Sequence, residues 1–167
     1  KIDISFAKNN MNKNLEIIIV NDGSQDNTSE IAEKLLDQYD NLILINLKIN
    51  NGKAYALDIG INNSKGEIIC IMDADIQYSP EDLIKMINLI YDGYDLINGK
   101  RNIRKDTFLT IFFSKIYNYI LRKLFKIKLN DFFSGIKVYK KEIFNLMDYS
   151  GLSRFVIFFS SKYNYNI

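Results

Sequence analysis

The sequence predicts an α/β fold with a mainly parallel central sheet, and three observations lead to this prediction. Apolar, β-branched runs typical of strands alternate with segments in which apolar residues recur at helical spacing. Short loops join them, so consecutive strands are expected to be parallel and linked by right-handed helical crossovers. The strand runs are almost continuously apolar, which is typical of strands covered by helices on both faces. The expected architecture is therefore a three-layer sandwich.

The expected elements follow one another in a regular order. Strands are predicted at 15–20, 42–47, 67–72 and 95–100, and helices at 28–39 and 53–63. A further helix begins at Pro80, because Ser79 is a favourable N-cap and proline is favoured at the first helical position. This helix is expected to bury Leu83, Ile84, Ile87, Ile90 and Tyr91. A long helix at 107–126, a strand at 136–140 and a short helix at 141–147 follow, and no dependable pattern appears beyond Ser150.

The composition indicates one globular domain and excludes several kinds of chemistry. The chain has 167 residues, of which 47% are hydrophobic and 25% charged. Cys70 is the single cysteine and histidine is absent, which excludes an intramolecular disulfide framework, Cys/His zinc sites and a Ser-His-Asp nucleophile. Carboxylates are therefore expected to carry most of any catalysis.

Charge is divided unevenly along the chain. Residues 1–99 contain 8 Lys/Arg and 16 Asp/Glu, whereas residues 100–167 contain 14 Lys/Arg and 4 Asp/Glu. This division reflects either drift in a Lys- and Asn-rich sequence, or an acidic half that holds a cation and a basic half that meets a phosphate or a membrane surface. No signal pattern and no apolar stretch of about 18 residues is visible, so a cytoplasmic protein is expected, with peripheral contact at the cytoplasmic membrane face as an option and no nucleic-acid partner.

Acidic residues follow two of the predicted strands at their carboxyl ends, where ligands bind in sheets of this kind. Asp73 and Asp75 come after a buried strand and, with Gln77, offer the oxygen ligands that suit Mg²⁺ or Mn²⁺. The alternative is a solvated acidic loop. Asp22 follows another strand, and it either forms a turn and caps the next helix or accepts a hydrogen bond from a ligand such as a nucleobase.

Three motifs in this order resemble those of the family 2 glycosyltransferases, which have the GT-A nucleotide-sugar fold, a Rossmann-like sandwich. They are the NDGS turn at 21–24, NGK at 51–53 and DAD at 73–75. DADIQ at 73–77, Arg101, and Asp131 with Ser134-Gly135 further resemble the polyprenyl-phosphate glycosyltransferases, the dolichyl-phosphate mannose synthase group. The resemblance runs from about residue 15 to residue 147.

The resemblance implies a role for particular residues. Asp22, Gly23 and Ser24 would bind the nucleoside, and Lys53, otherwise a solvated residue at a helix start, would touch the donor. Asp73, Asp75 and Gln77 would hold Mg²⁺ or Mn²⁺ against the donor diphosphate, and Asp75 and Asp131 would be catalytic. Arg101 and Ser114 would lie at the acceptor, although the basic residue that the group places shortly before this serine is replaced here by Thr110 or Ile111.

The implied reaction is metal-dependent, inverting transfer of a sugar from a nucleoside-diphosphate sugar to a polyprenyl phosphate. A phosphate acceptor is already ionised and needs no base, which suits a chain without histidine. The alternatives are transfer to a saccharide hydroxyl in surface polysaccharide synthesis, with Asp131 as the base, or a truncated fragment without activity. The helix at 107–126 would lie at a membrane interface or in the core.

One departure from the family concerns its first strand. The family opens with an additional strand before the NDGS turn, but only fourteen residues precede Leu15 here. The run Ile2–Phe6 is too close to Leu15 for a parallel crossover, which needs about a dozen residues. We therefore expect one N-terminally truncated GT-A domain over 1–167, with a nucleotide-sugar and metal half at 1–99 and an acceptor-side half at 100–167.

Overall fold

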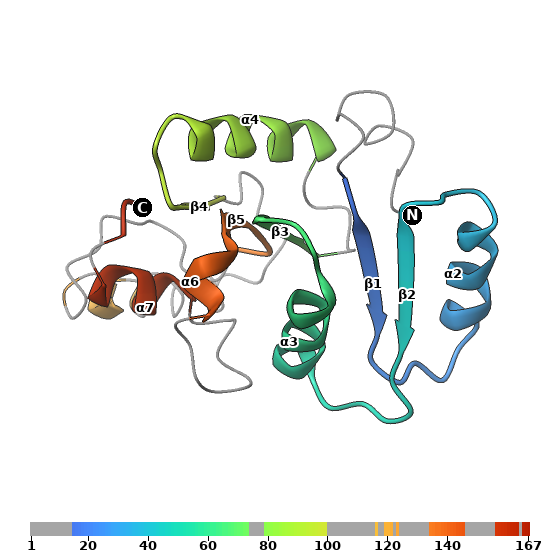
Figure 1. Ribbon diagram of the computed structural model, residues 1–167. Coiled ribbons are helices and arrows are strands. Elements are labelled where there is room, and N and C mark those ends of the chain that lie inside the picture. Colours follow the sequence, from blue (N-terminus) through green and yellow to red (C-terminus); the bar gives the residue numbers. More distant parts are fainter. Residues whose placement is uncertain are drawn as a thin grey trace.

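The described strands form two hydrogen-bonded sheets (Figure 1). The computed structural model describes residues 15–73, 79–99, 116, 119–121, 123, 134–145, 156–163 and 165–167. In the first sheet β1 (Ile17–Asn21) and β2 (Leu42–Asn46) pair in parallel. The second sheet has the order β3 (Ile68–Met72), β5 (Ile136–Lys140) and β4 (Leu96–Asn98), with β5 antiparallel to both neighbours.

Helices cover both faces of the second sheet, which gives the expected three layers. The helices are α2 (Thr28–Leu36), α3 (Lys53–Asn63), α4 (Pro80–Tyr91), α6 (Lys141–Asn145) and α7 (Val156–Lys162). Figure 1 shows α4 on one side of the sheet and α6 and α7 on the other. Alternate residues of β5 follow this division, since Val138 packs with Met86 of α4 whereas Tyr139 packs with Ile143 of α6. The α/β class and the layered architecture predicted from the sequence are confirmed.

The strand directions are parallel except at β5. β3 and β4 run in the same direction because both are antiparallel to β5, and β1 and β2 are parallel to each other. The alternation of strands and helices runs from β1 to β4, and it predicts parallel directions for these four strands only. β5 lies after it in the sequence and enters between β3 and β4 in the opposite sense, so the second sheet is mixed.

α3 packs against both sheets. A methyl group on Gly60 would lie 3.3 Å from Cγ2 of Val20 in β1, so helix and strand are in close contact there. On its other side Ile61 is buried in the core that includes Ile69 and Ile71 of β3. The C-terminal half of α3 is therefore in contact with both sheets.

The starts of the predicted elements agree with the structure to within two residues, but α2 and β4 end earlier than predicted and some buried positions differ. Ser79 caps α4, because its Oγ accepts a hydrogen bond from the backbone N–H of Glu81. Tyr91, predicted to be buried, is 76% exposed, whereas Met86 is buried. The residues facing the sheet are 83, 86, 87 and 90, a narrow stripe at helical spacing from which Tyr91 is rotated away.

The C-terminal region contains a helix, α7, that was not predicted from the sequence. α7 buries Val156, Ile157 and Ser160 at helical spacing, and this spacing was the available signal. Of the helix predicted at 107–126, residues 116, 119–121 and 123 are described, and all are helical. The predictions about residues 1–14 lie outside the described residues, and the division into halves at residue 99 stays a prediction. Within the described ranges, none of the helices combines the length and the apolar character that crossing a bilayer requires.

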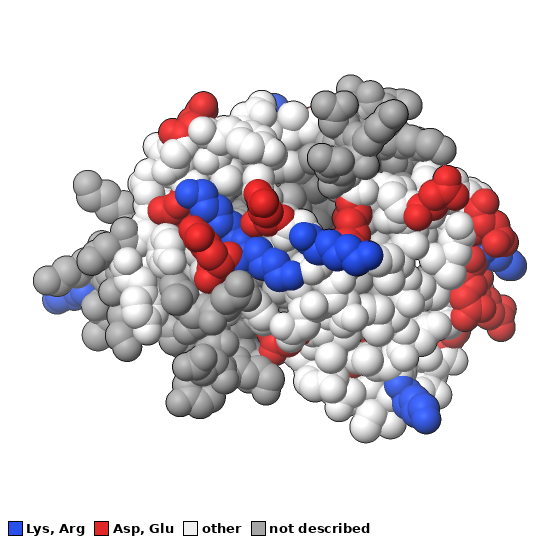
Figure 2. Space-filling view, viewed as in Figure 1, with Lys and Arg blue, Asp and Glu red and all other residues white. Residues whose placement is uncertain are grey.

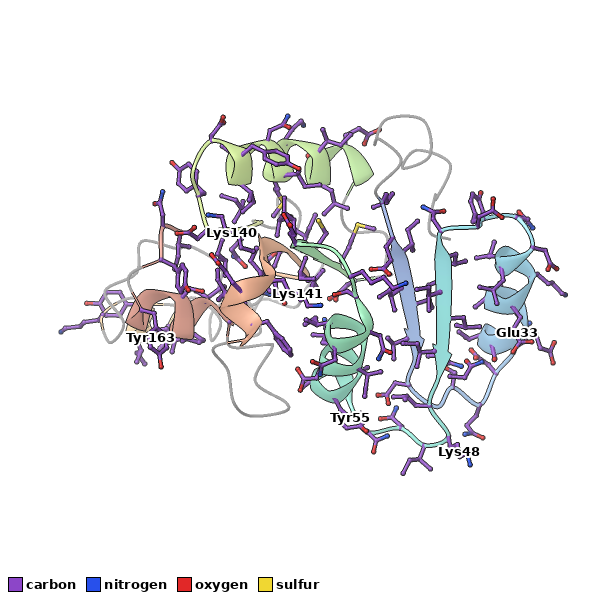
Figure 3. The ribbon with its side chains drawn as sticks, in the orientation of Figure 1. Glu33, Lys48, Tyr55, Lys140, Lys141 and Tyr163 are labelled. Carbon is purple, nitrogen blue, oxygen red and sulfur yellow. The ribbon has the colours of Figure 1, made fainter. Side chains whose placement is uncertain are left out.

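Charged side chains are distributed unevenly on the surface. Figure 2 shows Asp and Glu side chains gathered over the flank formed by α2, where Glu30, Glu33 and Asp37 are exposed. Figure 3 shows Lys140 and Lys141 at the junction of β5 and α6. Their side chains have different partners, since Lys140 pairs with Asp95 and Lys141 donates to the carbonyl oxygen of Ser64 at the end of α3. A cation at that helix end is favourable.

Asp95 is expected to make the stability of the fold depend on pH. Its carboxylate accepts hydrogen bonds from Lys140 Nζ at 2.6 Å and from the backbone N–H of Asn166 at 2.9 Å. Burial raises the pKa of Asp95, but these bonds outweigh it and the net pKa is lowered. A lowered pKa means that the stabilisation is complete above the carboxyl group's unfolded pKa and is lost as the pH falls through the folded value. Asp95→Asn should therefore lower the midpoint of thermal unfolding by a few degrees at pH 7 and by less at pH 3.

Thermal unfolding followed by circular dichroism between pH 3 and pH 7 measures this difference. Asp40→Asn is the control, because Asp40 is exposed in a turn and loses the same charge. An Asp95→Asn variant whose midpoint shift does not change over this pH range would contradict the assignment.

Candidate active site

The carboxylate of Asp22 connects the end of β1 to the start of α3. Its Oδ1 accepts the backbone N–H of Asn51 and its Oδ2 accepts that of Gly52, both at 2.8 Å. The helix that follows β1 has Asn27 at its N-cap, and Oδ1 of Asp26 accepts the N–H of its first residue, Thr28, at 3.1 Å. Asp22 therefore organises the loop before α3 and does not cap α2.

Gly23 and Ser24 form a tight turn against the same loop. The N–H of Ser24 donates to Oδ1 of Asn21 at 3.1 Å, which closes the turn. Gly23 has φ +70, and a methyl group there would lie 2.6 Å from backbone atoms of both Ile49 and Asn50. The NDGS turn and the NGK segment are thus packed together, as expected for two motifs that serve one site.

The second acidic turn reaches the same helix start through an ion pair. Lys53 is the first residue of α3, and its Nζ lies 2.5 Å from Oδ1 and 2.6 Å from Oδ2 of Asp73. The Lys53 side chain is 50% exposed and that of Asp73 is 28% exposed, so solvent reaches the pair. Lys53 is therefore more than a solvated residue at a helix start, which was one of the two roles predicted for it.

β5 holds Asp73 in place. The backbone N–H of Asp73 donates to the carbonyl oxygen of Gly135 at 3.0 Å, which continues the pairing of β3 with β5. Gly135 also leaves the space that the carboxylate occupies, because a methyl group there would lie 2.5 Å from Oδ2. The match of Ser134-Gly135 to the family motif therefore has a steric explanation at this end of the sheet.

Of the three predicted ligands of a divalent cation, the structure describes one, Asp73. The Asp73 carboxylate is a hard oxygen donor at the end of β3, which is the ligand type that Mg²⁺ and Mn²⁺ prefer. Asp75 and Gln77, the other predicted ligands, lie outside the described residues. No group of three or more Asp, Glu, Cys or His side chains suited to a metal occurs among the residues that are described.

The predicted acceptor-side residues belong to a part of the chain that the structure does not describe. Arg101, Ser114 and Asp131 all lie outside the described residues, so their roles stay predictions. The residues that the structure does bring together are Asp22, Lys53 and Asp73, which come from three separate motifs and meet around the start of α3.

Two buried charged residues near this site were not singled out from the sequence. Lys137 is 8% exposed, and its Nζ donates to the carbonyl oxygen of Ser134, next to Gly135. Asp58 is 3% exposed on the inner side of α3. Both had a signal in the sequence, because Lys137 interrupts an apolar strand and Asp58 shares the apolar stripe of α3 with Ala54 and Ile61.

Comparison with known proteins identifies the family. The family model described as Glycosyl transferase family 2 matches residues 4–147, most of the chain. The chain belongs to this family. The three motifs that meet at the start of α3 are therefore those of a family 2 glycosyltransferase, as the sequence predicted.

Curated relatives of this family 2 chain share one description. The undecaprenyl-phosphate 4-deoxy-4-formamido-L-arabinose transferase of Shewanella sediminis is 28% identical over 142 residues, covering 84% of this chain and 43% of the relative. The transferase with the same name from Photorhabdus laumondii is 32% identical over 133 residues, covering 79% of this chain and 41% of the relative. The chain thus spans less than half the length of these relatives.

A solved structure supports the GT-A fold of the family 2 chain. It is a mannosyltransferase from Pyrobaculum calidifontis in complex with GDP-Man and Mn²⁺, with a TM-score of 0.56 and 17% identity. The match covers 80% of this chain and 37% of the other. At this level of identity the likeness shows the fold alone.

Proposed function

We propose that this chain transfers a sugar, with inversion and with a divalent metal ion, from a nucleoside-diphosphate sugar to a polyprenyl phosphate. One observation carries the proposal. Three family motifs, separated by up to about fifty residues, bring Asp22, Lys53 and Asp73 together around the start of α3. This is the carboxyl-end position at which α/β sheets bind ligands.

The donor would lie across the start of α3. Asp22 and the turn at Gly23 and Ser24 would bind the nucleoside, because Asp22 retains lone pairs beyond those its two backbone partners use. Asp73, with Asp75 and Gln77, would hold Mg²⁺ or Mn²⁺. When bound, the ion neutralises negative charge on the departing nucleoside diphosphate. The GDP-Man and Mn²⁺ of the solved neighbour are consistent with such a donor site.

The acceptor is proposed to be a lipid phosphate. The matched relatives are named as undecaprenyl-phosphate transferases, and residues 100–167 carry 14 Lys/Arg against 4 Asp/Glu. A phosphate oxygen would form the new bond to the anomeric carbon while the bond to the nucleoside diphosphate breaks on the opposite face. Arg101 and Ser114 would orient that phosphate, and positioning would supply most of the acceleration.

The exposed side of the helical residues 116, 119–121 and 123 is proposed to contact the membrane in which such an acceptor lies. Ile116, Tyr119, Ile120 and Lys123 are all exposed and lie at i, i+3, i+4 and i+7, so they share one side of the helix. Leu121, on another side, is buried. Apolar side chains beside a lysine suit the interface of an anionic bilayer.

Calorimetric titration with UDP and GDP, with and without Mn²⁺, tests the donor site. We expect one nucleotide to bind only with Mn²⁺, and we expect Asp73→Asn and Asp75→Asn each to remove this binding. Asp40→Asn, which removes a carboxylate on the α2 side of the molecule, should bind as the unmodified chain does. Absence of nucleotide binding under every condition, from a chain that circular dichroism shows to be folded, would contradict the proposed function.

A further inference from the structure

We infer that Lys53 is an exchangeable cation that neutralises Asp73 when no divalent ion is bound and moves to the donor diphosphate when one is. The inference rests on the proposed function and deepens it, since it concerns the same site. It assigns to Lys53 a change of partner during donor binding.

The geometry of the pair shows why the two cations compete. Nζ of Lys53 lies at nearly equal distances, 2.5 and 2.6 Å, from the two oxygens of Asp73. The ammonium group therefore occupies the fork of the carboxylate, where both oxygens would otherwise face a metal ion. A divalent cation on the same oxygens would stand within a few ångströms of the ammonium, and like charges at that distance repel strongly. Metal binding at Asp73 thus requires Lys53 to withdraw.

The stability of α3 does not explain a lysine at this position. The first turn of a helix favours acidic residues because the N-terminal end of the helix dipole is positive, and the first turn of α3 has none. Lys53 adds a positive charge there instead, and its partner Asp73 comes from a different element, at the end of β3. The preferences of helix ends do not account for a lysine at position 53, whereas a role in the site does.

The pair is also suited to exchange. Half of the Lys53 side chain is exposed, and ion pairs accessible to solvent contribute little to stability. The side chain is long and flexible, so the ammonium can turn away from Asp73 while the helix stays in place. The anion that would arrive with the metal ion is the donor diphosphate, and the start of α3 is where it would lie.

The test uses Lys53→Met, which keeps the length of the side chain and removes its charge. Without nucleotide, Mn²⁺ affinity, measured from the electron paramagnetic resonance of free Mn²⁺, should rise about three- to five-fold because the competing cation is gone. With saturating Mn²⁺, nucleotide affinity, measured by calorimetry, should fall about ten-fold because a charged contact to the diphosphate is lost. Opposite changes in the two affinities are the signature of an exchanged partner.

Two further variants serve as controls. Lys48→Met removes the same charge from an exposed loop residue near the start of α3, so it should change neither affinity by more than about two-fold. Lys53→Arg keeps a cation that can engage both oxygens of Asp73, so it should restore the weaker Mn²⁺ affinity.

The outcomes separate the inference from the proposed function. Nucleotide and Mn²⁺ binding by the unmodified chain, with an unchanged or lower Mn²⁺ affinity in Lys53→Met, would overturn the exchange and leave the proposed function in place. Failure of the folded, unmodified chain to bind Mn²⁺ or nucleotide would overturn both. An equal rise in Mn²⁺ affinity in Lys48→Met would overturn the exchange, because general electrostatics would then explain the gain.

Discussion

Replacing Gly23 by alanine is expected to lower the free energy of unfolding by about 2–4 kcal/mol. Two causes add at this position. The backbone has φ +70, a region that costs residues with a Cβ about 1 kcal/mol or more. The new methyl group would also lie 2.6 Å from backbone atoms of Ile49 and Asn50, and backbone cannot give way as a flexible side chain can. Urea unfolding at pH 7 measures the loss.

Gly52→Ala is a matched control for the first of these causes. Gly52 also has a positive φ, +88, but a methyl group there would meet no atom within 4 Å. It should therefore cost only the conformational part, about 1–3 kcal/mol, because φ +88 with ψ 157 is a region that almost only glycine adopts. An equal loss of unfolding free energy in the two variants would contradict the close contact between Gly23 and the loop before α3.

The fold could be predicted largely because its first four strands and three helices follow one simple pattern. The bounds predicted for α3 and β5 match those of the structure, and α4 begins at the predicted proline. Each of these elements has a strong local signal, such as the Ser-Pro start of α4. The direction of β5 has no local signal, because antiparallel entry between two strands is decided by the packing of the whole sheet.

Burial on the outer helices was harder to predict. Ile31 and Leu36 of α2 belong to an apolar stripe, yet they are 53% and 38% exposed, whereas Ala32 is buried. α2 covers a sheet of only two described strands, so a narrow part of the helix is in contact. A periodic pattern gives the side of a helix that faces inward, but not the width of the surface that it meets.

For the candidate site, the motifs indicated the residues but not their contacts. Asp22 was predicted either to form a turn and cap the next helix or to bind a ligand. The structure shows a third use, since Asp22 accepts two backbone N–H groups from the loop before α3. The pairing of Lys53 with Asp73 joins residues twenty positions apart on different elements. Such contacts depend on how α3 is placed against β3, which short-range sequence patterns do not contain.

Gly135→Ala is expected to weaken Mn²⁺-dependent nucleotide binding at least ten-fold, about 1.4 kcal/mol, while the chain stays folded. The added methyl group would lie 2.5 Å from Oδ2 and 2.8 Å from Cγ of Asp73. Both atoms belong to a side chain that solvent reaches, so the carboxylate can rotate away. Cβ of Asp73, at 3.2 Å, requires a shift of only a few tenths of an ångström, so the sheet is largely spared. The rotation would separate Asp73 from Lys53 and from any ion held in its place. Calorimetric titration with UDP and GDP in Mn²⁺ measures the loss.

Gly66→Ala provides the comparison, because a methyl group there would lie 3.5 Å from the carbonyl oxygen of Ile68, an ordinary contact. It should leave nucleotide binding unchanged. Normal binding by Gly135→Ala would mean that the position of the Asp73 carboxylate does not matter to the donor, and the metal assignment at this residue would then be wrong. Weakened binding with an unchanged unfolding midpoint would instead locate the effect in the site, and it would give the glycine of the Ser134-Gly135 motif a direct reason, namely room for the carboxylate that faces it.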